Sequence, residues 1–504
     1  MSRPLAITSL RRLLRQRVGR PLPGRFGRAR SAEHPGRLGL ALVAVIVAVS
    51  AAALATPSAA RAGLLRGLDD TRMGTLSQAD RDAHLHEITA LLHARLIRID
   101  CNWPDAEPSR GGYTDTGYLG NVVAAAQAAH ALGVKVIVTI AYVPKWASDS
   151  AFWDDPPSSD YTGYQRFYPM KASALDDFTS FAKHLSSALK GDVLGYEPYN
   201  EPNLWTNLYP QRTAADGEFA VHRYIDYLKA FRAGVRAGDP DALVAGGATA
   251  PHGSNDRTNP FWTSPQAFAT AFKAAGGGGD CDVYSHHPYV PGSYPAAMDP
   301  ALPPLSPSRT VSLQNIGVLL KLFPRKPFWM TEFGFSTADS LHFGPGITFT
   351  NQAIYLKKGF AMAARHRQIT TLVWYDLQDS SPTGDDSSPQ GWYLGLRRVG
   401  GGTKPSWYAY ARGNRISLSA PPSARRGALI RLSGRYTCKS VGGVQGKRLT
   451  LLHKVGGKPW AIVRHVVTGA DGRFSLRLRC GATQRYRLVW PGVVIGVSRL
   501  VTTR

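Results

Sequence analysis

The chain has 504 residues, of which 43% are hydrophobic and 19% are charged. This length and composition are typical of a globular protein with more than one domain, and they exclude an intrinsically disordered chain. The net charge of +25 lies at the two ends, because residues 1–37 carry ten arginines and one acid, and residues 416–504 carry 17 basic residues and one acid. The region between them is close to neutral, so the charge does not indicate a nucleic-acid-binding protein.

An uncharged apolar segment, Leu38–Ala55, follows the arginine-rich start of the chain. Small residues come after it and end in Ala60-Arg61-Ala62, which resembles a signal-peptide cleavage site. Residues 1–62 are therefore interpreted as a basic lead with a signal peptide. The alternative is an uncleaved membrane anchor whose basic end stays in the cytoplasm. Both interpretations predict a secreted or otherwise extracytoplasmic protein.

From Gly63 onward, short apolar runs alternate with segments of helical periodicity, which is typical of βα units. The expected strands are Leu64–Leu68, Arg95–Asp100, Val134–Ile140, Val193–Tyr196, Ala242–Ala245, Asp282–His286, Phe328–Met330 and Thr371–Tyr375. The expected helices are Gln78–His93, Tyr118–Leu132, Ala174–Leu189, Ala215–Ala237, Pro265–Ala275, Ser312–Phe323, Thr350–His366 and Lys404–Tyr410. This order predicts a (β/α)8 TIM barrel over residues 63–413, although an open, doubly wound sheet fits the same alternation.

The pattern changes after the barrel region. Residues 414–428 include Pro421 and Pro422 and are predicted to be a linker. Residues 429–504 contain short alternating segments separated by glycine-rich turns. They predict an all-β, immunoglobulin-like sandwich.

The four cysteines predict one disulfide and no metal site. Cys438 and Cys480 both lie in the predicted sandwich, and in an exported protein we expect them to form a disulfide. Cys101 and Cys281 are expected to be free, buried thiols on distant barrel strands. The spacing of the cysteines does not match that of zinc ligands.

Two glutamates follow apolar runs that have strand character. Glu201 lies in Asn200-Glu201-Pro202, where the proline ends the preceding strand. Glu332 follows Phe328–Met330 and precedes Gly334, which opens the next loop. In a barrel, residues at the carboxyl ends of the strands meet around a common cleft. Two carboxylates in such a cleft are what acid–nucleophile cleavage of a glycosidic bond requires.

These two motifs, in this order, resemble those of the retaining glycoside hydrolases of clan A, particularly families five and thirty-nine. The resemblance covers roughly Gly63–Arg412. It implies a barrel enzyme in which Glu201 is the general acid/base and Glu332 is the nucleophile, with no metal and no cofactor. Glu197, four residues before Glu201, is interpreted as a buried hydrogen-bonding group below the cleft.

The resemblance also implies substrate-binding residues, namely Asn200, Arg98, His287, Tyr289, Trp374, Trp103 and Asp100. Asn200 would hold the 2-hydroxyl of the reacting sugar, whereas Arg98 and Tyr289 would contact the nucleophile. Trp374 would form the aromatic floor of the sugar site. The chain departs from the clan at the end of the third strand, where Tyr142 stands in place of a frequent histidine.

A long loop, Ala141–Lys171, contains eight aromatic residues. Loops of this length usually have a function. Flat aromatic rings suit the apolar C–H faces of sugars, and Trp146 is expected to be one of the rings that contact substrate. The alternative is a loop whose rings pack only against one another.

The sequence thus predicts an exported, retaining glycosidase that acts on β-linked oligo- or polysaccharides. The alternative is a catalytically inactive barrel that binds polysaccharide at the cell surface. The basic carboxy-terminal region is either an ordinary solvated surface or a binding site for an acidic cell-wall polymer, and no nucleic-acid partner is predicted. The sequence does not select the sugar, or choose between exo and endo action.

Overall fold

The computed structural model describes residues 63–504, except 155–156, 158, 162, 292–294 and 386. The predicted signal peptide or anchor, residues 1–62, lies outside the described residues. Within the described part of the chain, no helix has both the length and the apolar character needed to span a membrane.

Eight parallel strands form a closed barrel in sequence order. They are β1 (Leu65–Asp69), β2 (Leu96–Asn102), β3 (Lys135–Ala141), β4 (Gly195–Glu197), β5 (Leu243–Thr249), β6 (Val283–His286), β7 (Phe328–Met330) and β8 (Ile369–Trp374). Pairing of β1 with β8, for example Leu68 with Trp374, closes the barrel. The predicted fold class is confirmed.

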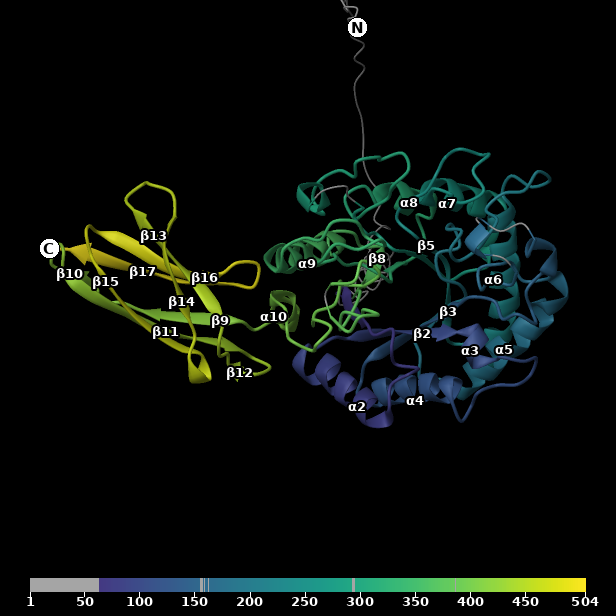
Figure 1. The fold of residues 1–504 in the computed structure, drawn as a ribbon, viewed down its shortest axis with the longest axis horizontal. Coiled ribbons are helices and arrows are strands. Elements are labelled where there is room, and N and C mark those ends of the chain that lie inside the picture. The colour runs from purple at the N-terminus through teal and green to yellow at the C-terminus, as the bar shows by residue number, and fades with distance from the viewer. Residues whose placement is uncertain (1–62, 155–156, 158, 162, 292–294, 386) are drawn as a thin grey trace, which may run out of the picture. The chain divides into compact units, whose positions relative to one another are not determined.

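Helices follow the strands and cover the outside of the barrel (Figure 1). They are α2 (Gln78–His86), α3 (Trp103–Ala106), α4 (Tyr118–Ala131), α5 (Leu175–Ala188), α6 (Phe219–Gly238), α7 (Pro265–Ala274), α8 (Gly317–Leu322), α9 (Phe349–Ala363) and α10 (Pro405–Ala411). Local sequence sets several of the boundaries. For example, the Ser264 hydroxyl accepts a hydrogen bond from Ala267 N at the start of α7, and Pro265 occupies the first helical position.

The carboxy-terminal strands form two further sheets, consistent with a β-sandwich. They are β9 (Arg415–Ser419), β10 (Ser423–Ala424), β11 (Leu429–Cys438), β12 (Gly442–Gly443), β13 (Arg448–Val455), β14 (Ala461–Val467), β15 (Arg473–Arg479), β16 (Gln484–Trp490) and β17 (Val494–Thr503). One sheet has the order β10-β17-β16-β13-β14, and the other has the order β12-β11-β15, with β9 also paired to β11.

The predicted linker over residues 414–428 is largely part of this sandwich. Ile416 and Leu418 are buried and alternate with exposed residues, so β9 has the inward and outward faces of a sheet strand. It pairs with β11 from Ser419 opposite Ser433 to Arg415 opposite Thr437. Pro421 and Pro422 lie in the short connection between β9 and β10, and do not form a linker between two domains.

The predicted disulfide between Cys438 and Cys480 is wrong, because both thiols are free and buried. Cys438 ends β11, whereas Cys480 follows Arg479, which pairs with Leu429 at the opposite end of β11. Ten residues of strand separate the two positions by roughly 30 Å, far beyond the Cα separation of about 7 Å that a disulfide tolerates. Cys101 and Cys281 are also free and buried, as expected.

Candidate active site

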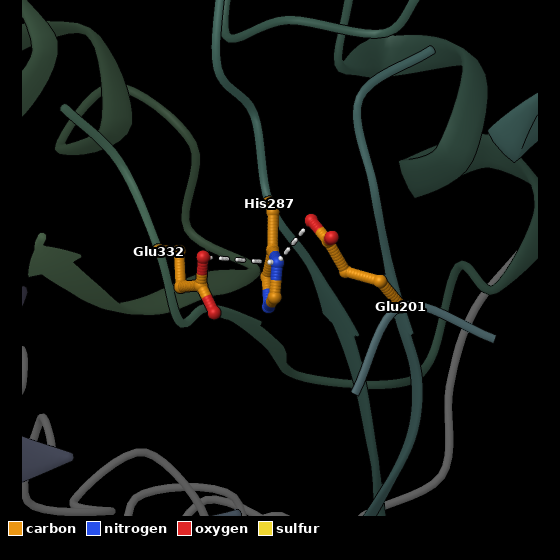
Figure 2. A group of neighbouring side chains, drawn as sticks. All are labelled: Glu201, His287 and Glu332. Carbon is orange, nitrogen blue, oxygen red and sulfur yellow. Dashed lines mark hydrogen bonds and ion pairs between the residues drawn. The ribbon is translucent and has the colours of Figure 1, made fainter. Parts of the chain in front are cut away.

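Glu201 and Glu332 come together with His287 above the barrel strands (Figure 2). Glu201 follows β4 and Glu332 follows β7, so both lie at carboxyl ends of parallel strands. One carboxylate oxygen of each glutamate and one ring nitrogen of His287 all lie within 4.8 Å of one another. The two acidic side chains therefore face the same space, although 131 positions of sequence separate them.

Glu201 and Glu332 line a pocket of about 1040 Å³. Among the residues singled out from the sequence, those that line it are Asp100, Tyr142, Asn200, Glu201, Tyr289 and Glu332. Its volume is sufficient for a ligand of one or a few sugar units. Its floor is acidic, while its walls carry aromatic and hydroxyl side chains.

Arg98 is the buried cation beneath this pocket. Its guanidinium forms ion pairs with four carboxylates, Asp69 at 2.6 Å, Asp100 at 2.9 Å, Glu197 at 3.3 Å and Glu332 at 3.0 Å. Burial alone would lower the pKa of Arg98, but these carboxylates raise it well above its ordinary value. Arg98 also donates a hydrogen bond to Asn200 Oδ1 at 2.8 Å, which fixes the side-chain amide beside Glu201.

Two further groups contact the Glu332 carboxylate. The Tyr289 hydroxyl donates a hydrogen bond to Glu332 Oε2 at 2.9 Å, and His287 Nδ1 lies 3.5 Å from the same oxygen. Burial raises the pKa of Glu332 above the ordinary carboxyl value, although His287 and Arg98 act in the opposite direction. These neighbours stabilise the charged form that a nucleophile must adopt.

His287 links the two glutamates, because its Nδ1 also lies 2.9 Å from Glu201 Oε1. Burial lowers the pKa of His287, but the two carboxylates outweigh it and raise the pKa overall. The preceding residue, His286, has a different role. It bonds to Thr249 and to the Val311 carbonyl, and burial lowers its pKa to about 3, so it remains a neutral structural group.

Glu197 is fully buried below the pocket, where it accepts hydrogen bonds from three hydroxyls. The donors are Thr139 at 2.6 Å, Thr331 at 2.7 Å and Ser285. Burial opposes its ionisation, but Arg98, His287 and the hydroxyl donors lower the pKa of Glu197 overall. It is thus a fixed anion that ties four strands together, and it does not line the pocket.

Trp374 does not form the floor of the pocket. Its side chain is 0% exposed, packs against Phe333 and Phe335, and donates a hydrogen bond to the Leu394 carbonyl at 3.1 Å. The next residue, Tyr375, lines the pocket instead. Successive side chains along a strand point to opposite faces, so Trp374 at the end of β8 packs in the barrel wall while the following Tyr375 faces the pocket.

Trp103 and Trp146 also lie away from the pocket lining. Trp103 is 0% exposed, and its indole N–H donates to the Glu107 carboxylate at 2.7 Å. Trp146 packs edge-on against Trp103 and donates to the Glu107 carbonyl at 2.9 Å. Much of the aromatic loop follows the self-packed alternative, because Phe167 and Tyr168 form a cluster with Tyr209 and their neighbours.

Several pocket residues lie in loops, where hydrophobic periodicity gives no signal. The aromatic and histidine side chains among them include Trp205, His252, Trp262, His342, Phe343 and Trp392. Backbone strain also marks the pocket. Tyr142, Glu201 and Ala248 have positive φ angles of 66°, 43° and 46°, which residues with side chains rarely adopt. Such strain is frequent at functional sites and is held by the surrounding contacts, here including the hydrogen bond from Glu201 N to Ala248 O.

Comparison with solved structures finds several glycoside hydrolases of limited similarity. A family 39 glycoside hydrolase from the gut symbiont Bacteroides cellulosilyticus WH2 is 19% identical, with a TM-score of 0.49, and the match covers 85% of this chain and 81% of that one. GH5_18 from Streptomyces cattleya, in complex with GlcNAc, is 17% identical with a TM-score of 0.48, covering 69% and 79%. A GH30 endoxylanase from Clostridium papyrosolvens C71 is 12% identical with a TM-score of 0.43, covering 83% and 95%.

A search of curated proteins finds no match. A family model does match, and it spans most of the barrel. The model is that of cellulase (glycosyl hydrolase family 5), and it matches residues 73–379, which include β2 to β8 and both glutamates. The resemblance to clan A glycoside hydrolases is thereby confirmed, and the chain belongs to the cellulase family, glycosyl hydrolase family 5.

Proposed function

We propose that the protein hydrolyses β-glycosidic bonds with retention of configuration, using Glu201 as acid/base and Glu332 as nucleophile. The observation that carries this proposal is the approach of the two glutamates, which bring carboxylate oxygens within 4.8 Å of each other. Retaining glycosidases separate their carboxyl groups by about 5–5.5 Å, whereas inverting enzymes leave about 6.5–9.5 Å for a water molecule. The short separation favours direct attack by Glu332.

In the first step, Glu332 attacks the anomeric carbon while Glu201 protonates the oxygen of the leaving group. The C–O bond breaks, and a glycosyl ester forms on Glu332. In the second step, Glu201 accepts a proton from water as the water oxygen attacks the same carbon, and Glu332 leaves as a carboxylate. Both side chains return to their starting protonation states.

The neighbouring residues have separate tasks in this scheme. Arg98 and Tyr289 donate to Glu332 and hold it in line with the anomeric carbon. Because Arg98 donates to Asn200 Oδ1, the amide NH₂ of Asn200 is left to donate to a sugar hydroxyl in the pocket. His287 positions Glu201 and Glu332 relative to each other.

The test is turnover of a panel of aryl β-glycosides, including xylosides, glucosides and mannosides, by the purified protein. Proton NMR of the first-formed product should show the β-anomer. Glu332→Gln should lose nearly all turnover on every substrate. Glu201→Ala should be partly rescued by substrates with good leaving groups, because these need little protonation in the first step. Equal activity in the wild type and in both variants would refute the assignment.

The second candidate is a catalytically inactive barrel that binds polysaccharide at the cell surface. The acidic pair and its donors disfavour it, because pure binding does not require two carboxylates whose oxygens lie within 4.8 Å of each other. If the wild type binds a β-linked oligosaccharide but turns over neither it nor any aryl glycoside of the panel, this candidate replaces the first. Chain length among the products of a polymeric substrate distinguishes exo from endo action.

We further propose that the protein works outside the cytoplasm and that its basic carboxy-terminal domain binds an acidic polymer, such as a cell-wall polymer. The apolar segment Leu38–Ala55 supports the first point, and the 17 basic residues against one acid in residues 416–504 support the second. Cell fractionation with amino-terminal sequencing distinguishes a cleaved signal from an anchor. Protein that is found only in the cytosol would contradict both forms of export.

A further inference from the structure

The outward face of three neighbouring strands in the carboxy-terminal domain consists almost entirely of arginine and serine. The strands β9, β11 and β15 lie side by side (Figure 1), with β11 in the middle. The outward residues that define this arginine–serine face are Arg415, Ser417, Ser419, Arg431, Ser433, Arg435, Arg473, Ser475, Arg477 and Arg479. The side chains of all six arginines are exposed, while buried apolar residues alternate with them and face the core.

The strand register places several of these arginines directly opposite each other. Arg431 pairs with Arg477, and Arg435 pairs with Arg473. Like charges at directly opposed positions destabilise a sheet, because their side chains lie about 5 Å apart at the Cβ atoms. A face that repeats this arrangement is poorly suited to stability and well suited to an anion lying between the paired side chains.

Little negative charge compensates the face within the domain. Asp471 is the one acidic residue of residues 416–504, and it pairs with Arg473 at 2.9 Å. Two other arginines contact neutral groups, because Arg431 donates to the Ser475 hydroxyl and Arg435 donates to the Asp471 carbonyl. These contacts orient the guanidinium groups along the sheet without neutralising them.

We propose that the arginine–serine face binds an extended polyuronate, an acidic polysaccharide chain with regularly spaced carboxylates. Guanidinium groups bind carboxylates through two parallel hydrogen bonds, and the serine hydroxyls between them suit sugar hydroxyls. Along β11 and β15, successive arginines of the face are two or four residues apart, which corresponds to spacings of about 7 and 13 Å. These spacings match a linear chain that carries a repeated charge. This inference rests on the proposed acidic partner and is independent of catalysis in the barrel.

Other polyanionic partners fit the face less well. It carries no aromatic side chain on which nucleic-acid bases could stack, and it is a flat sheet surface rather than a helix or ribbon that enters a groove. Beside it, β9, β11 and β15 expose a single large apolar side chain, Leu429, which is too little for insertion into a lipid surface. Hydroxyls and guanidinium groups in alternation favour a carboxylated sugar chain.

The test measures binding of the full-length Glu332→Gln protein to polygalacturonate, with neutral dextran and duplex DNA as comparisons. The Glu332→Gln background prevents cleavage of the polymer. We expect polygalacturonate to bind more tightly than DNA of equal charge, with affinity that falls as salt rises, and dextran not to bind. The triple variant Arg431→Gln, Arg435→Gln, Arg477→Gln should bind polygalacturonate about tenfold more weakly.

The matched control removes three charges from the other sheet of the same domain and from the turn between its strands β13 and β14. Arg448, Lys458 and Arg485 are exposed and lie outside the arginine–serine face, so their replacement by glutamine gives the same net charge. It should weaken binding less than twofold, and neither variant should have a lower Tm than the parent. Equal weakening in both triple variants, tighter binding to DNA, or no binding to polygalacturonate would each overturn the proposal, even if the barrel proves to be an active glycosidase.

Discussion

At the scale of single residues, the carboxylates of the site outnumber its positively charged groups. Arg98 is the common partner of Asp69, Asp100, Glu197 and Glu332, and the two glutamates beside His287 raise the pKa of its imidazole. Because the carboxylates compete for Arg98, their pKa values shift in different directions. The pKa of Glu197 is lowered, whereas burial raises the pKa of Asp69 and of Glu332. The catalytic role that we propose for Glu332 then depends on its hydrogen-bond donors.

The raised pKa of Glu332 predicts the acid limb of the pH profile. A nucleophile must be ionised, so kcat/KM should fall as the pH drops through a value above the ordinary glutamate pKa of about 4.3. Tyr289→Phe removes a donor to the carboxylate, which raises its pKa further and moves the acid limb to higher pH. We expect a loss of roughly tenfold or more in kcat/KM for this variant. An unchanged acid limb in Tyr289→Phe would show that another group controls it.

Arg98 should also matter for stability. Arg98→Met leaves four buried or partly buried carboxylates without their shared cation, and breaking buried ion pairs from one side typically costs about 3–5 kcal/mol. The free energy of unfolding from urea titration measures this loss. Arg95→Met, at an exposed position before the same strand, should change it by less than about 0.5 kcal/mol. If the two variants had similar free energies of unfolding, Arg98 would not be important for stability.

At the scale of elements, the barrel strands could be predicted because strands buried on both faces are nearly continuous apolar runs. The run Val134–Ile140 becomes β3 with a shift of one residue, and Phe328–Met330 becomes β7 without any shift. The glutamates that follow β4 and β7 could be predicted for the same reason. The apolar pattern does not specify which neighbour at the end of a strand faces the pocket, so it does not distinguish Trp374 from Tyr375.

The pocket walls could not be predicted, because they come from loops that have no periodicity. Trp262 and Trp392 reach the pocket from segments of irregular structure. Positive φ angles normally indicate glycine, but here Tyr142 and Ala248 adopt them. Such conformations depend on tertiary contacts and leave no signal in composition.

The alternation along β8 predicts different effects at two adjacent aromatic residues. Trp374→Ala should destabilise the protein by about 3–5 kcal/mol, because it leaves a cavity in the barrel wall. Tyr375→Ala removes a pocket residue and should raise KM or lower kcat/KM with a smaller loss of stability. Urea unfolding and steady-state kinetics on both variants separate the two effects. If Trp374→Ala were as stable as the wild type but bound substrate poorly, Trp374 would have to contact the sugar.

The register of β11 with β15 predicts the redox state of the sandwich. Because it separates Cys438 from Cys480, all four thiols should be free in protein purified without reductant. A thiol reagent added after unfolding in guanidinium should count four reactive groups per chain. Two groups would indicate a disulfide, and the register of these strands would then have to differ.

At the scale of the whole molecule, the two functions proposed for the chain lie on different parts of it. The region matched by the family model contains the acidic pocket, whereas the arginine–serine face belongs to strands that follow the barrel. The charge distribution already indicated this division, since net charge can be counted without a fold. It did not show which surface carries the arginines, because this depends on strand register.

The most direct test of the account is the identity of the residue that becomes covalently attached to sugar. The protein should be incubated with an activated 2-deoxy-2-fluoro glycoside of the sugar that the aryl glycoside panel selects, and the labelled peptide mapped by mass spectrometry. A glycosyl ester on Glu332, absent from Glu332→Gln, is the predicted result. A label on another residue, or efficient hydrolysis with an inverted product and no label, would contradict it.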